Sequence, residues 1–125
     1  MTAEKQTIRE IPLGDLERSV RELHGDGYRL VQIGCTAIEE AYEINYSFDK
    51  DFTFLNLRVT VTPETEVPSI SGIYWGAFIY ENEMHDLFGI PVTGMNIDFH
   101  GAMIRTAQKQ PFSVTRKGEG PCRNA

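Results

Sequence analysis

Four ionisable side chains close together are the part of this sequence best suited to chemistry: Glu81, Glu83, His85 and Asp86. If the segment is helical, Glu81 and His85 lie one turn apart and face the same side. A carboxylate and an imidazole so placed can share a metal ion or pass a proton between them. A metal site would need a further ligand, from His100 or another carboxylate, and the H-E-x-x-H zinc motif is absent.

Three interpretations of this cluster remain open. The first is the metal site, and the second is acid–base catalysis by Glu81 or Glu83 together with His85. The third is structural, with the carboxylates accepting hydrogen bonds from the backbone or from an arginine of a neighbouring element or chain. No nucleophile elbow or phosphate-binding loop accompanies the cluster, which favours the structural interpretation. Because Glu81 falls on an apolar stripe, it needs a partner, and His85 is the nearest candidate.

The cluster lies near the end of a predicted long helix, which begins with Ser69 as its N-cap and ends at about Phe88. Gly89 suits the left-handed conformation that ends a helix, and Pro91 prevents the helix from resuming. One side of this helix forms an apolar stripe that should cover a sheet: Ile70, Ile73, Tyr74, Ala77, Met84 and Phe88.

The other side of the predicted helix is not uniformly polar, which predicts a second partner for it. Its residues form a candidate interface with another chain: Gly72, Trp75, Gly76, Ile79, Asn82, Glu83 and Asp86. The small pair Gly72 and Gly76 would permit a close approach of two backbones. The second partner is either another protein or the C-terminal tail. The alternative is that Trp75 and Ile79 are ordinary exposed apolar residues, which are common.

The rest of the chain predicts the elements that position this helix. Residues 12–24 form an amphipathic pattern with a period typical of a short helix. Residues 28–38, 42–48 and 54–62 alternate between apolar and polar, as half-buried antiparallel strands do. Residues 95–99 are a candidate fourth strand. The predicted fold class is α+β, a two-layer sandwich of a mainly antiparallel, three- to four-stranded sheet and two helices.

Composition excludes several classes of protein. The net charge is −6, which argues against nucleic-acid binding. The sequence has no run of about 18 apolar residues, so we expect no membrane-spanning helix. The N-terminus lacks the apolar stretch of a secretory signal. Cys35 and Cys122 lie far apart without a metal-binding spacing, so we expect no metal or cluster held by this chain alone.

We expect three segments. Residues 1–11 form an N-terminal extension, residues 12–105 form the domain, and residues 106–125 form a basic tail that is rich in proline and glycine. From Arg105 to the end the chain has five basic residues and one acidic residue, so the tail could lie on an acidic partner or on anionic lipid. A solvated tail is the simpler interpretation.

The helical segment resembles a known family. Pro68-Ser69-Ile70, followed by E-N-E-M-H-D-L-F-G-I from Glu81 to Ile90, is similar to the signature of the complex I 30-kilodalton subunit. That signature is roughly P-S-I, a helix with A-x-W, then E-R-E-x-x-D-x-F-G-I. The positions that match are Ala77, Glu81, Glu83, Asp86, Phe88, Gly89 and Ile90. Asn82, Ile79 and Met95 depart from it, and with Asp98-Phe99-His100-Gly101 the chain looks more like the energy-converting nickel–iron hydrogenase branch.

The resemblance implies a non-catalytic structural and assembly subunit in the cytoplasmic arm of a membrane-bound hydrogenase or complex I-like oxidoreductase. Its partners would be a hydrogenase-like large subunit and a cluster-bearing small subunit, which hold the cofactors for electron transport. Ion translocation would belong to membrane subunits. The subunit would be cytoplasmic and peripheral, on the inner face of the membrane, and associated with it only through the complex. The rival hypotheses are a stand-alone metal-dependent enzyme using Glu81 and His85, and a small binding module without redox partners.

Overall fold

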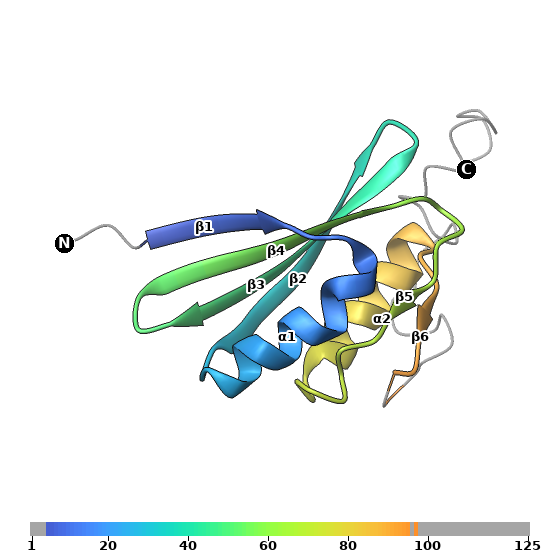
Figure 1. Ribbon diagram of the computed structural model, residues 1–125. Coiled ribbons are helices and arrows are strands. Elements are labelled where there is room, and N and C mark those ends of the chain that lie inside the picture. The colour runs from blue at the N-terminus through green and yellow to red at the C-terminus, as the bar shows by residue number, and fades with distance from the viewer. Residues whose placement is uncertain (1–4, 96, 98–125) are drawn as a thin grey trace.

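The structure is a computed structural model that describes residues 5–95 and 97, and it consists of a four-stranded sheet with two helices (Figure 1). A short 3-10 turn, Leu13–Asp15, precedes the first helix. The elements are β1 (Lys5–Glu10), α1 (Leu16–Gly25), β2 (Arg29–Ile38), β3 (Ala41–Lys50), β4 (Thr53–Val61), β5 (Val67–Pro68), α2 (Ala77–Phe88) and β6 (Val92–Thr93).

The sheet has the strand order β1-β4-β3-β2, and its last three strands form the antiparallel meander predicted from the sequence. Strand β1 adds a parallel neighbour to β4, and the sequence did not predict it. Thr7, Ile8, Arg9 and Glu10 are all exposed, so this edge strand lacks the apolar alternation by which a strand is recognised.

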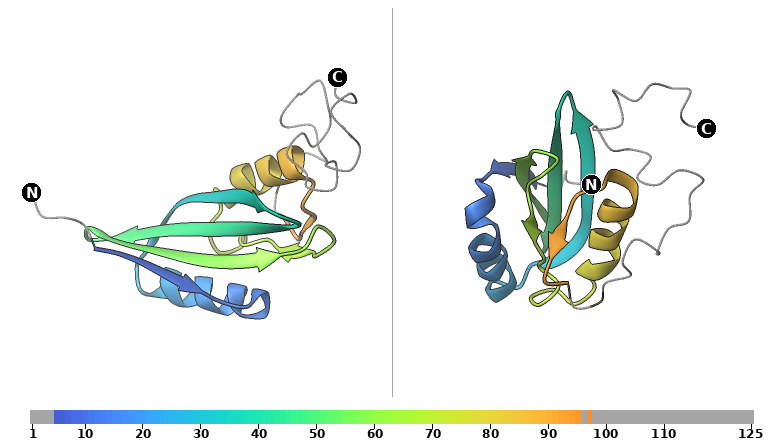
Figure 2. Two further views of the ribbon diagram at one scale, coloured as in Figure 1. Left: turned by 90° about the horizontal axis from the view of Figure 1, so that it is seen from above. Right: turned by 90° about the vertical axis from the view of Figure 1, so that its right-hand side faces the viewer.

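Both helices contribute to one hydrophobic core against the sheet, with α1 near β1 and β4 and α2 near β2 (Figures 1 and 2). The inward residues of β3 and β4 alternate as predicted and are buried: Tyr42, Ile44, Tyr46, Phe48, Leu55, Leu57, Val59 and Val61. Helix α1 adds Leu16, Val20 and Leu23 to the same core, and α2 adds Ala77 and Met84. The α+β sandwich of a sheet and two helices is therefore confirmed.

Helix α2 ends where the sequence predicted but begins much later. Gly89 has φ of 80° and its N–H donates to the carbonyl of His85 at 2.9 Å, which confirms the left-handed C-terminus. The helix begins at Ala77, so the predicted start with Ser69 as N-cap is wrong. The segment 69–76 is a loop of turns, because the backbone N–H of Ile70 binds a side chain of α2 and the segment contains the helix-disfavouring Gly72 and Gly76.

The chain after α2 forms β6, which pairs in parallel with β5 and lies beside α2. Met95 and Ile97 are not in a strand, and the remainder of the candidate strand 95–99 lies outside the described residues. His100 and the basic tail 106–125 also lie outside them. Among the helices of the described part, none combines the length and the apolar character needed to cross a membrane.

Candidate functional site

Glu81 is the centre of the ionisable cluster and is completely buried, with 0% of its surface exposed. Its carboxylate accepts a hydrogen bond from the Ser69 hydroxyl at 2.6 Å and another from the backbone N–H of Ile70 at 2.8 Å. Burial raises the pKa of Glu81 above its usual value, and the two hydrogen bonds oppose that rise. The carboxylate therefore fastens the loop 69–76 to the helix.

The predicted pairing of Glu81 with His85 is wrong. A helical side chain leans toward the N-terminus of its helix, so Glu81 reaches the loop before α2 and not the next turn. His85 lies instead beside Asp86, with 3.4 Å between Nδ1 and Oδ1. Across residues 5–95 and 97, no group of three or more His, Cys, Asp or Glu side chains could hold a metal ion. The arrangement around Glu81 is that of the structural interpretation.

The loop 69–76 is anchored at both ends. At its start, the Ser71 N–H donates to the Ser69 hydroxyl at 3.0 Å, and the same hydroxyl binds Glu81. Near its end, the Tyr74 hydroxyl donates to the carbonyl of Tyr28 at 2.6 Å. The Trp75 ring lies edge-on to Phe78, with 5.0 Å between ring centroids. Trp75, with 66% of its surface exposed, is thus carried on a loop that is fixed at both ends.

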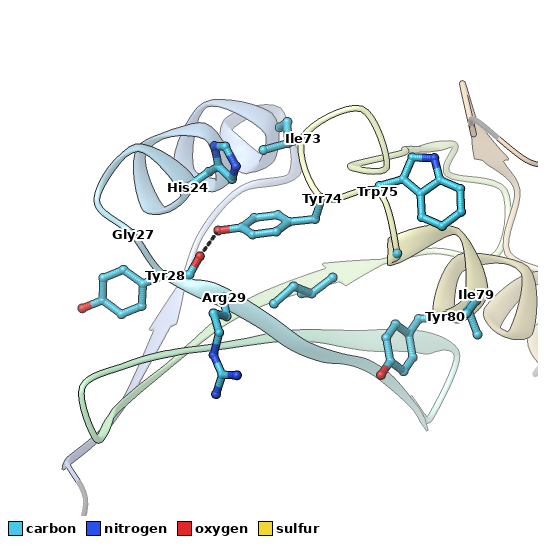
Figure 3. Close-up of a pocket in the computed structure, with 11 residues that line it drawn as sticks. His24, Gly27, Tyr28, Arg29, Ile73, Tyr74, Trp75, Ile79 and Tyr80 are labelled. Atoms are coloured by element: carbon cyan, nitrogen blue, oxygen red, sulfur yellow. Dashed lines mark hydrogen bonds between the residues drawn. The ribbon is translucent and has the colours of Figure 1, made fainter.

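Trp75 borders a cleft of about 750 Å³ between the end of α1, the start of β2, the loop and the first turn of α2. His24, Tyr74 and Trp75 line one side of it, and Arg29, Ile79 and Tyr80 line the other (Figure 3). The described residues that line the cleft include no carboxylate, although the chain has a net charge of −6. The cleft is therefore an aromatic depression, lined by no carboxylate, on an acidic molecule.

The structure divides the candidate interface into exposed and buried members. Trp75 and Ile79 are 66% and 50% exposed, and Gly72, Gly76 and Glu83 are not buried either. That these five residues contact a partner stays a prediction.

The expectation that Asn82 and Asp86 point away from the domain is wrong, because they are 0% and 5% exposed. The Asn82 side-chain amide donates to the carbonyls of Phe78, at 2.8 Å, and Ile97, at 2.9 Å. The chain after β6 therefore returns beside this side of α2 and covers it.

Sequence reasoning missed the cleft residues Tyr28, Tyr80 and His24, because tertiary packing brings the end of α1 beside the loop before α2 and no local pattern records it. Two other groups, one partly and one fully buried, offer no second site. Burial raises the pKa of the Cys35 thiol to about 12, so it is a poor nucleophile at neutral pH. The Tyr46 hydroxyl is buried without a hydrogen-bond partner among the described residues, and burial raises its pKa as well.

The fold and the cluster together define a small α+β domain in which the buried Glu81 holds a loop that borders an aromatic cleft. The family model of the respiratory-chain NADH dehydrogenase 30 Kd subunit matches residues 10–114. The chain belongs to that family, which supports a role as a subunit of an oxidoreductase complex.

Two relatives and one solved structure illustrate what the chain is similar to. A subunit of the NADH-quinone oxidoreductase of Bartonella bacilliformis is 35% identical over 60 residues, which are 46% of this chain and 29% of the relative. The corresponding protein of a Jannaschia species is 40% identical over 55 residues, which cover 38% of this chain and 27% of the relative. The matched segment therefore spans under a third of each relative's length. A chain of the membrane-bound sulfane sulfur reductase, an archaeal respiratory membrane complex, has the same fold, with a TM-score of 0.76 at 18% identity over 89% of this chain and 69% of that one.

Proposed function

We propose that the chain is a non-catalytic structural and assembly subunit of a membrane-bound hydrogenase or complex I-like oxidoreductase, and that it packs on the hydrogenase-like large subunit. The observation that carries this proposal is Trp75, a large aromatic residue held exposed on a fixed loop at the edge of a cleft. Tryptophan is among the residues that most often dominate the binding energy of protein interfaces. Membership of the 30 Kd subunit family supports a partner of this kind.

The loop that borders the cleft is held in one conformation before any partner binds. Glu81 and Tyr74 hold the loop in place, so little conformational freedom is lost when a partner binds. The aromatic lining offers a large contact area, and the phenol groups can stay hydrogen-bonded at the rim, as the Tyr80 hydroxyl is to the carbonyl of Val31 at 3.1 Å. An apolar segment of the large subunit, with a polar or acidic end beside His24, would match this surface.

The proposal extends to the assembly. The large subunit and a cluster-bearing small subunit supply the redox cofactors, and this chain supplies none. The complex carries out electron transport coupled to ion translocation through its membrane subunits. The chain lies in the cytoplasmic arm, peripheral on the inner face of the membrane, and associates with the membrane through its partners.

Co-purification with the large subunit tests the proposal. Trp75→Ala should leave the domain folded but weaken association about 30-fold, the equivalent of roughly 2 kcal/mol for an interface anchor. Ile38→Ala is the matched control, because Ile38 is 45% exposed at the far end of β2 and outside the cleft. Association of Trp75→Ala at the wild-type level would show that the cleft is not the docking surface.

A further inference from the structure

The turn between β3 and β4 has an unusual residue at its tip. Lys50 pairs with Thr53, which leaves Asp51 and Phe52 as a two-residue loop. Their φ angles are 49° and 66°, both in the left-handed region. This is the conformation of the type I′ hairpin turn, whose second central position is most often glycine. Aspartate tolerates the left-handed region, whereas a phenylalanine there is strained.

Burial does not compensate for this strain. Phe52 is 81% exposed, the highest value among the large apolar side chains of the described residues. Neither the turn nor the core of this chain therefore explains an aromatic residue at this position. Strained backbone at an exposed position is typical of sites that bind something else.

The surroundings of Phe52 indicate a protein partner. A hollow of about 410 Å³ next to it is lined by Arg29, Asp49, Asp51 and Phe54. Arg29 donates from Nε and Nη2 to the carboxylate of Asp49, at 2.9 and 2.8 Å, so its charge is already matched. Asp51 precedes Phe52 and lines the same hollow, and its carboxylate would be repelled by an anionic lipid surface. A protein pocket with an apolar floor and a basic rim would suit both Phe52 and Asp51.

The hollow and the cleft beside Trp75 share one residue at the edge of the sheet. Arg29 lines both of them, from the first position of β2. Arg29 pairs with Asp49, which alternates with the buried Phe48, so the hollow lies on the face of the sheet away from the helices. A partner that covers the cleft therefore reaches the tip of the β3–β4 hairpin by passing around the edge strand β2 at Arg29. Two aromatic anchors on separate, well-fixed elements would set the orientation of the partner as well as its position.

We propose that Phe52 is a second anchor of the docking surface, which inserts into an apolar, basic-rimmed pocket of the large subunit while Asp51 meets the basic rim. The identity of this partner rests on the proposed function. The proposal gives a reason for the strained phenylalanine: the turn retains it for binding, although it lowers the stability of the isolated domain.

Replacement of Phe52 tests the proposal, because stability and binding should change in opposite directions. Phe52→Gly should raise the melting temperature of the isolated chain, since glycine adopts a positive φ without strain, and should weaken association with the large subunit at least tenfold. Phe52→Tyr keeps the aromatic ring and should bind within threefold of the wild type. Glu39→Gly is the matched control, because Glu39 has φ of 55° in the β2–β3 hairpin at the opposite end of β3. It should raise the melting temperature and leave association unchanged.

Each result decides the proposal. A Phe52→Gly variant that binds as the wild type does, or one that is less stable, overturns it. Loss of binding to phosphatidylserine vesicles, with association intact, would assign Phe52 to a lipid surface and overturns it too. If Trp75→Ala weakens association and Phe52→Gly does not, the second anchor is wrong and the docking cleft stands. If Phe52→Gly alone weakens association, the anchor stands and the cleft is wrong. If both bind normally, both are wrong.

Discussion

The replacement of Glu81 by alanine should destabilise the domain and release its docking loop. The change removes the acceptor for the Ser69 hydroxyl and the Ile70 N–H, which lie at 2.6 and 2.8 Å. Each hydrogen bond to a charged group contributes about 1.5–3 kcal/mol, and relief from burying a carboxylate offsets part of the sum. We expect a net loss of about 2–4 kcal/mol in the free energy of unfolding. At about 4 °C per kcal/mol for a domain of this size, the melting temperature should fall by roughly 10 °C.

Two variants make this test specific. Glu81→Gln keeps an oxygen for the Ile70 N–H, and its amide can donate to Ser69 while the Ser69 hydroxyl turns to Ser71, 2.7 Å away. Its loss should therefore stay below about 1.5 kcal/mol, the scale of one neutral hydrogen bond. Glu83→Ala is the control, because Glu83 is an exposed carboxylate on the same helix and should change stability by no more than about 0.5 kcal/mol.

Thermal melts measure the stability of each variant, and fluorescence reports the loop directly because Trp75 is the single tryptophan. In Glu81→Ala, acrylamide should quench Trp75 more strongly than in the wild type at temperatures where both are folded. Equal melting temperatures for Glu81→Ala and Glu83→Ala, or unchanged quenching, would refute the argument that Glu81 fastens the loop.

Glu81 also predicts the sign of a pH effect. Burial raises its folded-state pKa above the ordinary value of 4.5, so the folded state binds more protons than the unfolded state at mildly acidic pH. The contribution of Glu81 to stability should therefore fall as the pH rises from about 4.5 through the raised pKa. Glu81→Gln cannot titrate, and the difference in stability between it and the wild type isolates this one group. A difference that stays constant, or changes in the opposite direction, would contradict the assigned shift.

Two further predictions concern the core and the end of α2. Tyr46→Phe should leave the stability unchanged or raise it by up to about 1 kcal/mol, because it removes a buried hydroxyl without a partner among the described residues; a loss of 2 kcal/mol in urea unfolding would indicate a partner or a water at this hydroxyl. Gly89→Ala should cost about 1 kcal/mol, because Gly89 has φ of 80° at the end of α2, and an unchanged urea midpoint would contradict it.

The sequence predicts the elements whose signals are local. The antiparallel meander is predicted from the alternation of apolar and polar residues in the two strands between Tyr42 and Val61. The end of α2 is predicted from Gly89. Strand β1 was missed because its edge position needs no apolar alternation. The start of α2 was misplaced because the apolar spacing of Ile70, Ile73 and Ala77 fits a helix, whereas the distant carboxylate of Glu81 holds Ile70 in a turn.

The same distinction applies to the candidate site. From their spacing in the sequence, Glu81 and Trp75 were predicted to lie on opposite sides of one helix, with no contact or role that links them. In the structure, the buried carboxylate of Glu81 fixes the loop that carries the exposed indole of Trp75, so the position of Trp75 depends on Glu81. A buried carboxylate and a left-handed phenylalanine at Phe52 both run against the rules that favour a stable fold. The two departures differ in kind: hydrogen bonds from the loop compensate the buried carboxylate, whereas nothing in the described residues compensates Phe52. A residue of the second kind is expected where binding and not folding determines it.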